Sequence, residues 1–334
     1  MPFEICPFAV QSQALTALHV SENVKAFLAL PPGLQRARID SWSLLKVLGL
    51  ALYSGYGCTV AEEALSRWWT STLSAIGDPA EIRRVMRDTG AVLSGSRAVR
   101  FLDRESSFDC SDWDFYTTEA GYDTFCSFVR EQLGGVEVSR VVGARPSRPF
   151  DGTSATANST ELKERRKFVT PNGSMDVMCS KTASALSPLT VFHSTVVMNY
   201  LTADGFCLAY PMPFFKRFNI RGHDADDRCV AKYRRRGFTV AEPELLFAAG
   251  STEHACLPWG LCTRHVRAFG DRYCLAFTFE KQGRPITHLC AFPRPLPTCM
   301  QEARGDDTAT EEGLTVDDFP ACVQFIPASL PWLD

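Results

Sequence analysis

The stretch LSGSRAVRFLDRESSFDCSDWDFY, Leu93–Tyr116, decides how the fold of this chain is interpreted. A Gly-Ser step, Gly95-Ser96, follows a short apolar run, and Asp112 and Asp114 stand one residue apart near the end of the stretch. Successive side chains of a strand point to opposite faces, so the two carboxylates would share one face of a strand. Like charges placed side by side destabilise each other unless a cation neutralises them, so the pattern predicts a cation-binding site.

The bulk composition is that of an ordinary soluble globular protein. The 334 residues are 45% hydrophobic and 22% charged, and the net charge is -3. This charge argues against general coating of nucleic acid, so any nucleic acid would have to be bound by a local basic patch. No apolar run reaches the roughly 20 residues that a membrane helix needs, so we expect no membrane partner.

The amino terminus and the cysteines favour an intracellular protein. The first residues, MPFEICPFAVQSQALTAL, lack a basic leader followed by a long apolar segment, so we expect no secretion signal. The 13 cysteines are an odd number and show no tight framework spacing. Reduced thiols in a cytoplasmic or nuclear protein are therefore expected.

The chain divides into three predicted regions. Residues 1–88 form a helical lead-in, with helices expected over Ser43–Gly55 and from Thr59 onward. Residues 89–203 alternate strands and helices, which predicts an α/β (α+β) core with a mixed sheet. Residues 204–334 are less defined and hold a basic helix, a Cys/His-bearing segment and an acidic segment that we expect to be a surface loop or disordered.

A predicted hairpin supplies a third carboxylate. Two short runs, RRKFVT and SMDVMC, flank Pro171-Asn172-Gly173, and Asn-Gly between such runs predicts a two-residue turn. Asp176 lies on the second arm of this hairpin. A helix is expected over Ala183–Leu201, after the hairpin.

These residues suit phosphate and metal binding. A Gly-Ser turn that opens a helix presents free backbone N–H groups and the positive end of the helix dipole to phosphate oxygens. Gly95 would allow a close approach, and Ser96 would add a hydroxyl; Lys181 and Lys232 are further candidate phosphate ligands. Hard cations prefer carboxylate oxygens, so one or two Mg²⁺ (or Mn²⁺) ions are expected on the three aspartates, Asp112, Asp114 and Asp176.

The segments Leu93 to Ser96, SDWDF and MDV, in this order, resemble the nucleotidyltransferase-fold superfamily. This superfamily is related to DNA polymerase beta and includes poly(A) and CCA-adding enzymes and the minimal nucleotidyltransferases. The resemblance covers about Thr89 to Leu201, and the loop between Ser96 and Asp112 is longer than usual for the family. The segments SGSRAVRFLDR, SDWDFY and FHSTVVMNYL are also similar to a group of uncharacterised fungal proteins, which implies no activity.

The resemblance implies an Mg²⁺-dependent enzyme that moves a nucleoside monophosphate from an NTP to a hydroxyl acceptor on RNA, a small molecule or a protein. Asp112 and Asp114 would hold Mg²⁺ at the triphosphate, and Asp176 would complete the acceptor-side metal site. Ser96 and the backbone at Gly95 would hold the β- and γ-phosphates. An alternative is a non-catalytic nucleotide-binding or protein-interaction module on the same fold, and another is a structural protein with a zinc-stabilised carboxy-terminal part.

The basic segment KYRRRGF, Lys232 to Phe238, allows two interpretations. Its cations could bind the triphosphate or a nucleic-acid acceptor, with Tyr233 or Phe238 stacking on a base. Alternatively, it is a solvated helix face that ends at Gly237.

The Cys/His-bearing segment is a candidate zinc site. EHACLPWGLCTRH places His254, Cys256, Cys262 and His265 close together, and Cys274 follows. Four such side chains could form a tetrahedral structural zinc site. The segment lacks a compact Cys-x2-Cys pair, however, and buried free thiols are the alternative.

Overall fold

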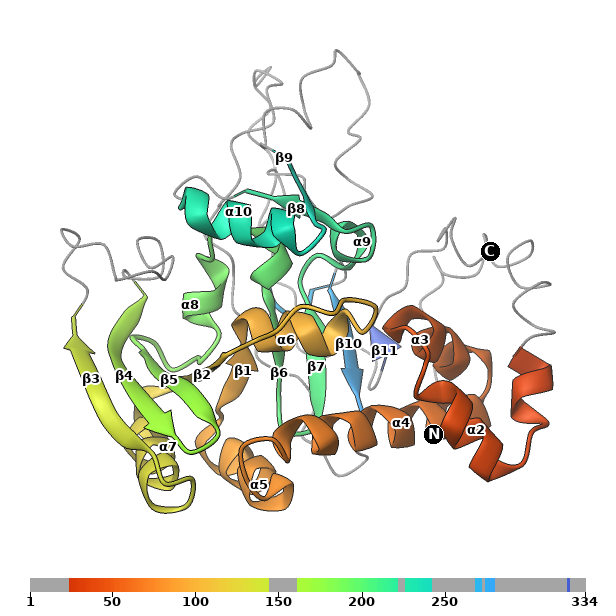
Figure 1. Cartoon of the computed structure of the whole chain (residues 1–334), viewed down its shortest axis with the longest axis horizontal. Helices are drawn as coiled ribbons and strands as arrows, with labels where there is room; N and C mark the ends of the chain where they lie inside the picture. Colours follow the sequence, from red (N-terminus) through yellow and green to blue (C-terminus); the bar gives the residue numbers. More distant parts are fainter. Residues whose placement is uncertain are drawn as a thin grey trace, which may run out of the picture.

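The computed structural model describes residues 24–143, 161–221, 226–241, 268–271, 274–279 and 323–324. Helices and a mixed sheet combine in an α/β arrangement, as expected from the sequence (Figure 1). The helices are α2 (Pro32–Ile39), α3 (Leu44–Tyr53), α4 (Gly55–Leu73), α5 (Pro79–Thr89), α6 (Gly95–Leu102), α7 (Glu119–Glu131), α8 (Ser187–Thr190), the 3-10 helix η3 (Thr195–Val197), α9 (Pro211–Phe215) and α10 (Asp227–Arg235). The strands are β1 (Val92–Ser94), β2 (Asp112–Thr117), β3 (Val136–Val142), β4 (Leu162–Thr170), β5 (Gly173–Ser180), β6 (Asn199–Leu201), β7 (Gly205–Leu208), β8 (Phe218–Ile220), β9 (Thr239–Ala241), β10 (Leu275–Thr278) and β11 (Val323–Gln324).

One sheet organises the described residues. Its nine strands follow the order β11-β10-β7-β6-β1-β2-β5-β4-β3, and β8 and β9 form a separate parallel pair. Within the large sheet β2 and β5 are parallel, whereas β1 is antiparallel to both β2 and β6. A parallel neighbour requires a crossover, and here α7, β3 and β4 separate β2 from β5 in the chain.

The two faces of β2 have different environments. The Phe115 ring packs against Phe125 of α7 with centroids 4.9 Å apart, and the guanidinium of Arg97 on α6 lies 4.3 Å from the Trp113 ring centroid. Trp113 and Phe115 are 1% and 0% exposed, so this face of the strand belongs to the core. Because side chains alternate, the even-numbered residues of β2 point to the opposite face.

Local capping determines where the helices of the first region begin. The helix expected from Thr59 begins instead at Gly55, and this part of the prediction was wrong. The Ser54 hydroxyl accepts a hydrogen bond from the backbone N–H of Gly57 at 3.0 Å, which satisfies a donor of the first turn. α5 is capped in the same way by Asp78.

The helix expected over Ala183–Leu201 was also wrong. The segment contains only the short α8, the 3-10 helix η3 and strand β6. β-Branched residues are frequent here and lose side-chain freedom in a helix. Sheet pairing provides the alternative, because Leu201 pairs with Leu93 of β1 and the Ser94 hydroxyl donates to the Asn199 carbonyl at 2.6 Å.

The predicted hairpin is confirmed, with a shift in its turn. Strands β4 and β5 are antiparallel, and Thr170 pairs with Gly173. The two turn residues are therefore Pro171 and Asn172 rather than Asn172 and Gly173. Asp176 lies on β5, as the sequence predicted.

The large sheet extends through the segment where the sequence suggested a division between residues 203 and 204. That division falls inside the β6–β7 hairpin, where Leu201 pairs with Phe206. β7 in turn pairs with β10, so strands from the second and third predicted regions share one sheet. None of the helices that the structure describes is long and apolar enough to span a membrane.

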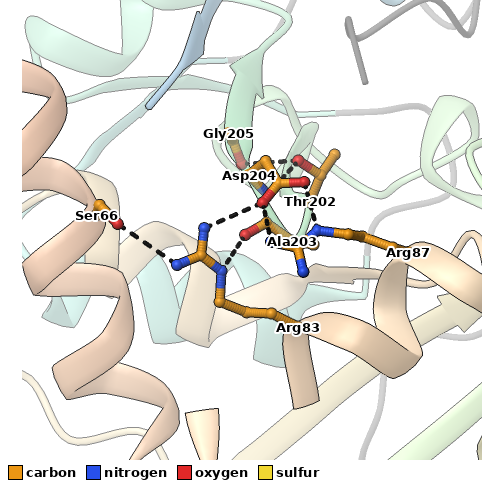
Figure 2. Close-up of polar contacts among 7 residues, drawn as sticks. All are labelled: Ser66, Arg83, Arg87, Thr202, Ala203, Asp204 and Gly205. Atoms are coloured by element: carbon orange, nitrogen blue, oxygen red, sulfur yellow. Dashed lines mark hydrogen bonds and ion pairs between the residues drawn. The ribbon is translucent and has the colours of Figure 1, made fainter. Parts of the chain in front are cut away.

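A buried ionic cluster joins the helical region to the β6–β7 hairpin (Figure 2). Arg83 of α5 donates through Nη2 to Oδ1 of Asp204 at 3.0 Å, through Nε to the Ala203 carbonyl at 2.7 Å, and through Nη1 to the Ser66 hydroxyl at 3.4 Å. Arg87 donates to both carboxylate oxygens of Asp204, at 2.6 and 2.9 Å. Arg83 and Asp204 are 7% and 4% exposed. The cluster therefore fixes α5 against the β6–β7 turn.

Removal of the Asp204 carboxylate should strongly destabilise the fold. Asp204→Ala leaves Arg83 buried without its anionic partner, so we expect the free energy of unfolding at pH 7 to fall by about 3–5 kcal/mol. Asp88→Ala on the same helix removes an exposed ion pair with Arg84 and should cost less than about 1 kcal/mol. Urea unfolding of both variants measures the difference; equal losses would contradict this role of the cluster.

The Asp204 contribution should depend on pH. Burial raises the pKa of this carboxyl, but hydrogen bonds and charges from Arg87 and Arg83 outweigh burial and hold the pKa below its ordinary value of 3.8. A depressed carboxyl pKa stabilises the folded state above that ordinary value, and the contribution is lost as the pH falls through the folded-state pKa. The difference between wild type and Asp204→Ala should therefore shrink in acid.

Candidate functional site

The parallel pairing of β2 and β5 brings the three predicted carboxylates to one face of the sheet. Asp114 pairs with Asp176 and Asp112 pairs with Ser174. Residues paired directly in a ladder share a face, and Asp112 and Asp114 share theirs by alternation. The arrangement therefore places Asp112, Asp114 and Asp176 together on the face opposite the Trp113 and Phe115 rings.

Gly95 is packed directly against this acidic cluster. It is the first residue of α6, follows strand β1, and has a φ of +67°. A Cβ atom added at Gly95 would overlap the Asp114 carboxylate. Glycine is therefore required here both for its backbone conformation and for the close approach. The start of a helix and a pair of carboxylates consequently share one site.

The charges of the three aspartates act on one another. Loss of hydration, followed by the charges of Asp176 and Asp112, raises the pKa of Asp114 to about 7, although Lys232 and Arg165 act in the opposite direction. Such a raised pKa is typical of carboxylates that share a site. Asp114 would therefore ionise fully at neutral pH only with additional positive charge nearby.

Arg165 is one of the cations that already act on this cluster. Its Nε donates to Oδ1 of Asp176 at 2.9 Å, and its Nη2 donates to Oδ2 at 3.1 Å. Asp176 is 3% exposed, so this is a bidentate pair with a buried carboxylate. Sequence analysis did not predict the pairing of Arg165 with Asp176. The signal was available in the hairpin, because Lys167 pairs with Asp176 and the residue two positions earlier on β4 shares its face.

Helix α10 brings more cations to the Gly-Ser turn. Arg236, which follows the helix, donates to the Ser96 hydroxyl at 2.9 Å, and the Tyr233 hydroxyl lies 3.3 Å from the same oxygen. The Arg236 guanidinium also lies 4.1 Å from the Phe108 ring centroid. Lys232 is close enough for its charge to lower the pKa of Asp114. The structure thus places Ser96 and Lys232 at the site, and it adds Arg236, which sequence analysis did not single out.

The prediction that Tyr233 or Phe238 stacks on a base was wrong. Tyr233 and Phe238 are each 2% exposed, and their rings pack against each other at 6.1 Å. Tyr233 instead positions Ser96. The basic segment is a helix followed by Gly237, whose φ of +82° suits a helix end, as one of the two interpretations predicted.

Tyr116 is a further polar group that sequence analysis missed. It lies two residues after Asp114 on β2 and therefore on the same face. Burial, and then the charges of Asp114 and Asp176, raise its pKa well above the ordinary value of 10.0. Its hydroxyl is therefore a neutral hydrogen-bond donor beside the acidic cluster.

Lys181 does not join the other candidate phosphate ligands. It is exposed, and it follows the last residue of β5. It lies five positions after Asp176, about 16 Å away if the chain is extended, so it is distant from the acidic cluster along the strand.

The candidate zinc ligands His254, Cys256, Cys262 and His265 lie outside the described residues. Cys274 is described and is fully buried. Its thiol donates to the Ala268 carbonyl at 3.3 Å. This contact is that of a buried thiol within the core.

Two of the three carboxylates at the site suit a hard cation, and the third is paired with Arg165. Asp112 and Asp114 offer carboxylate oxygens on one strand face, the ligands that Mg²⁺ prefers. Asp176 is bound by Arg165 instead. In the ranges that the structure describes, no three His, Cys, Asp or Glu side chains are gathered closely enough to hold a metal ion. The two aspartates of β2 therefore fit Mg²⁺, whereas both carboxylate oxygens of the third are hydrogen-bonded to its guanidinium partner.

Comparisons of the chain with models of protein families, with curated proteins and with solved structures found no match. The assignment of the site therefore depends on its own residues and geometry.

Substitution of Gly95 should measure how tightly the Gly-Ser turn packs against the Asp114 carboxylate. Gly95→Ala adds both a strained positive φ and the overlap with Asp114, whereas Gly90→Ala adds only the strain, because its Cβ would meet no atom within 4 Å. We expect Gly90→Ala to cost about 1–2 kcal/mol of unfolding free energy. Gly95→Ala should cost about 1–3 kcal/mol more.

A double-mutant cycle identifies the source of this excess. In an Asp114→Ala background the overlapping carboxylate is absent and only the Cβ of residue 114 remains near, so the cost of Gly95→Ala should fall close to that of Gly90→Ala. Denaturant unfolding of the single and double variants provides the four free energies. An unchanged cost of Gly95→Ala in that background would show that the Gly95–Asp114 contact is not responsible.

Proposed function

We propose that this protein is an Mg²⁺-dependent nucleotidyltransferase that moves a nucleoside monophosphate from an NTP to a hydroxyl acceptor. The packing of Gly95 against the Asp114 carboxylate is the observation that carries the proposal. It joins a helix start, which binds phosphate, to an aspartate pair, which binds a hard cation. A nucleoside triphosphate complexed with Mg²⁺ presents both kinds of group to such a site.

Each part of the site has a proposed role in binding. Asp112 and Asp114 would hold Mg²⁺, which when bound neutralises triphosphate charge and makes the α-phosphate more electrophilic. The N–H groups at the start of α6 and the Ser96 hydroxyl would bind the β- and γ-phosphates. Lys232 and Arg236 would add positive charge on the same side of the site.

The acceptor side of the site would be formed by Asp176 and Tyr116. Asp176 pairs with Asp114 on the adjoining strand and could accept a hydrogen bond from an acceptor hydroxyl through a lone pair that Arg165 leaves. The Tyr116 hydroxyl, which remains protonated at neutral pH, could donate to an oxygen of the nucleotide or of the acceptor. These contacts suit a hydroxyl acceptor and do not distinguish RNA, a small molecule and a protein.

One observation favours a second candidate, a nucleotide-binding module without turnover. Arg165 occupies both oxygens of Asp176, the carboxylate that would serve the acceptor side. A site with only Asp112 and Asp114 available could bind an Mg²⁺–NTP complex without activating an acceptor. Turnover measurements distinguish the two candidates.

The proposal predicts an activity that depends on Asp114. The full chain, incubated with each α-labelled NTP and Mg²⁺ or Mn²⁺, should transfer label to RNA, to protein or to a small acceptor and release pyrophosphate. Asp114→Asn removes charge from the metal site and should lower the turnover rate at least ~100-fold. Asp88→Asn, at an exposed position of α5, is the matched control and should retain full activity. Nucleotide binding without turnover in wild type would select the binding module.

The same substitution should stabilise the metal-free protein. The Asp114 pKa is raised to about 7 from 3.8, so between these pH values the folded state binds more protons than the unfolded state. Wild-type stability should therefore fall as the pH rises through this window, by at most about 1.4 kcal/mol per pH unit. In the presence of EDTA, Asp114→Asn should melt higher than wild type above pH 7, and the difference should vanish near pH 4. A constant difference across this range would contradict the shared acidic site.

The cations at α10 should contribute to nucleotide affinity. Lys232→Met and Arg236→Met each remove a positive charge beside the Gly-Ser turn, and each should weaken NTP binding about 10-fold or more. Arg234→Met removes an exposed charge from the same helix and should leave affinity nearly unchanged. Titration of a fluorescent, non-hydrolysable NTP analogue in Mg²⁺ compares the three. Equal affinities of all three variants would exclude α10 from the binding site.

A further inference from the structure

We infer that Arg165 takes the place of the acceptor-side metal ion, so that the site binds a single divalent cation. The inference rests on the proposed function, and it defines how many metal ions that function uses. One ion would be held by Asp112 and Asp114 of β2. The third carboxylate, Asp176, would instead be matched by a guanidinium built into the neighbouring strand β4.

The geometry of the ion pair supports this assignment. Both carboxylate oxygens of Asp176 accept a hydrogen bond from Arg165, at 2.9 and 3.1 Å. The two side chains are only 4% and 15% exposed, respectively. A bidentate pair of this kind fixes the orientation of the carboxylate as well as its charge, and a bound metal ion would have to compete with both contacts.

The β4–β5 ladder keeps the guanidinium in place. Arg165 pairs with Met178, and Lys167 pairs with Asp176 itself, so both cations lie on the face that carries the acidic cluster. Arg165 reaches Asp176 diagonally across the ladder. The Lys167 side chain makes no hydrogen bond or ion pair with any of the residues that the structure describes, although Lys167 is the direct neighbour of Asp176 in the ladder. The pairing is therefore selective for the planar guanidinium, which matches a carboxylate at two points.

The local charges also favour one ion. A second divalent ion at Asp176 would lie beside a guanidinium that is mostly shielded from water, where like charges repel more strongly than in solvent. The negative charge of a bound triphosphate would be neutralised by other groups, namely Lys232, Arg236 and the start of α6.

Arg165 would accordingly be a positioning residue. It orients Asp176 toward the acceptor side without contacting the reacting atoms, and it supplies there a positive charge that does not dissociate. A site of this kind should require only one metal-binding event for each bound nucleotide.

Counting bound Mn²⁺ tests the inference. Electron paramagnetic resonance measures free Mn²⁺ in a titration of the full chain saturated with an α,β-methylene NTP analogue, which prevents turnover. Wild type should bind one Mn²⁺ per chain. Arg165→Met frees the Asp176 carboxylate and should bind two, whereas Lys167→Met removes a cation from the same strand face, leaves the Arg165 pair intact and should bind one.

The possible outcomes separate this inference from the proposed function. Two Mn²⁺ ions in wild type, or one in folded Arg165→Met, would overturn the single-ion assignment and leave the nucleotidyltransferase proposal standing. Absence of both Mn²⁺ and nucleotide binding in every variant would overturn the proposed function and the inference together. If Arg165→Met does not fold, the wild-type count still decides, and Arg165→Lys, which keeps the charge, should again bind one.

Discussion

The in-register pairing of Asp114 with Asp176 on parallel strands is the constraint on which the rest of the site depends. The sheet backbone fixes the two carboxylates on one face, where neither can move away from the other without loss of ladder hydrogen bonds. The repulsion between the two carboxylates contributes to the raised pKa of Asp114. The charge of Asp176 is matched by the bidentate guanidinium of Arg165. The pairing of the two carboxylates is costly in itself, because buried like charges weaken folding.

Elements that are distant in sequence assemble around this pair. Helix α6 begins against the Asp114 carboxylate because Gly95 has no Cβ atom. Helix α10 comes from about 140 residues later in the chain, and there Arg236 and Tyr233 both contact the Ser96 hydroxyl. The Arg83–Asp204 cluster holds α5 to the β6–β7 turn, and β6 pairs with the strand that precedes Gly95. The position of the phosphate-binding turn is thus connected to the packing of the helical region.

Local patterns predicted the parts of the site that lie within single elements. Alternation predicted the shared face of Asp112 and Asp114, and the hairpin signal predicted the strand that carries Asp176. Contacts between elements could not be predicted in this way, because Arg165 meets Asp176 diagonally across a ladder and Arg236 meets Ser96 from a helix about 140 residues later. The helix expected after the hairpin was wrong because its apolar spacing also suits a short strand paired with β1.

The central claim is that Asp112, Asp114 and the Gly95-Ser96 turn form one Mg²⁺–nucleotide site. Crystals of the full chain grown with Mn²⁺ and a non-hydrolysable NTP analogue test this claim most directly, because anomalous scattering locates manganese independently of the protein model. The account predicts a manganese peak between the carboxylates of Asp112 and Asp114, with the triphosphate on the backbone N–H groups at the start of α6. A nucleotide bound elsewhere, or manganese that avoids both carboxylates while the nucleotide is present, would contradict it.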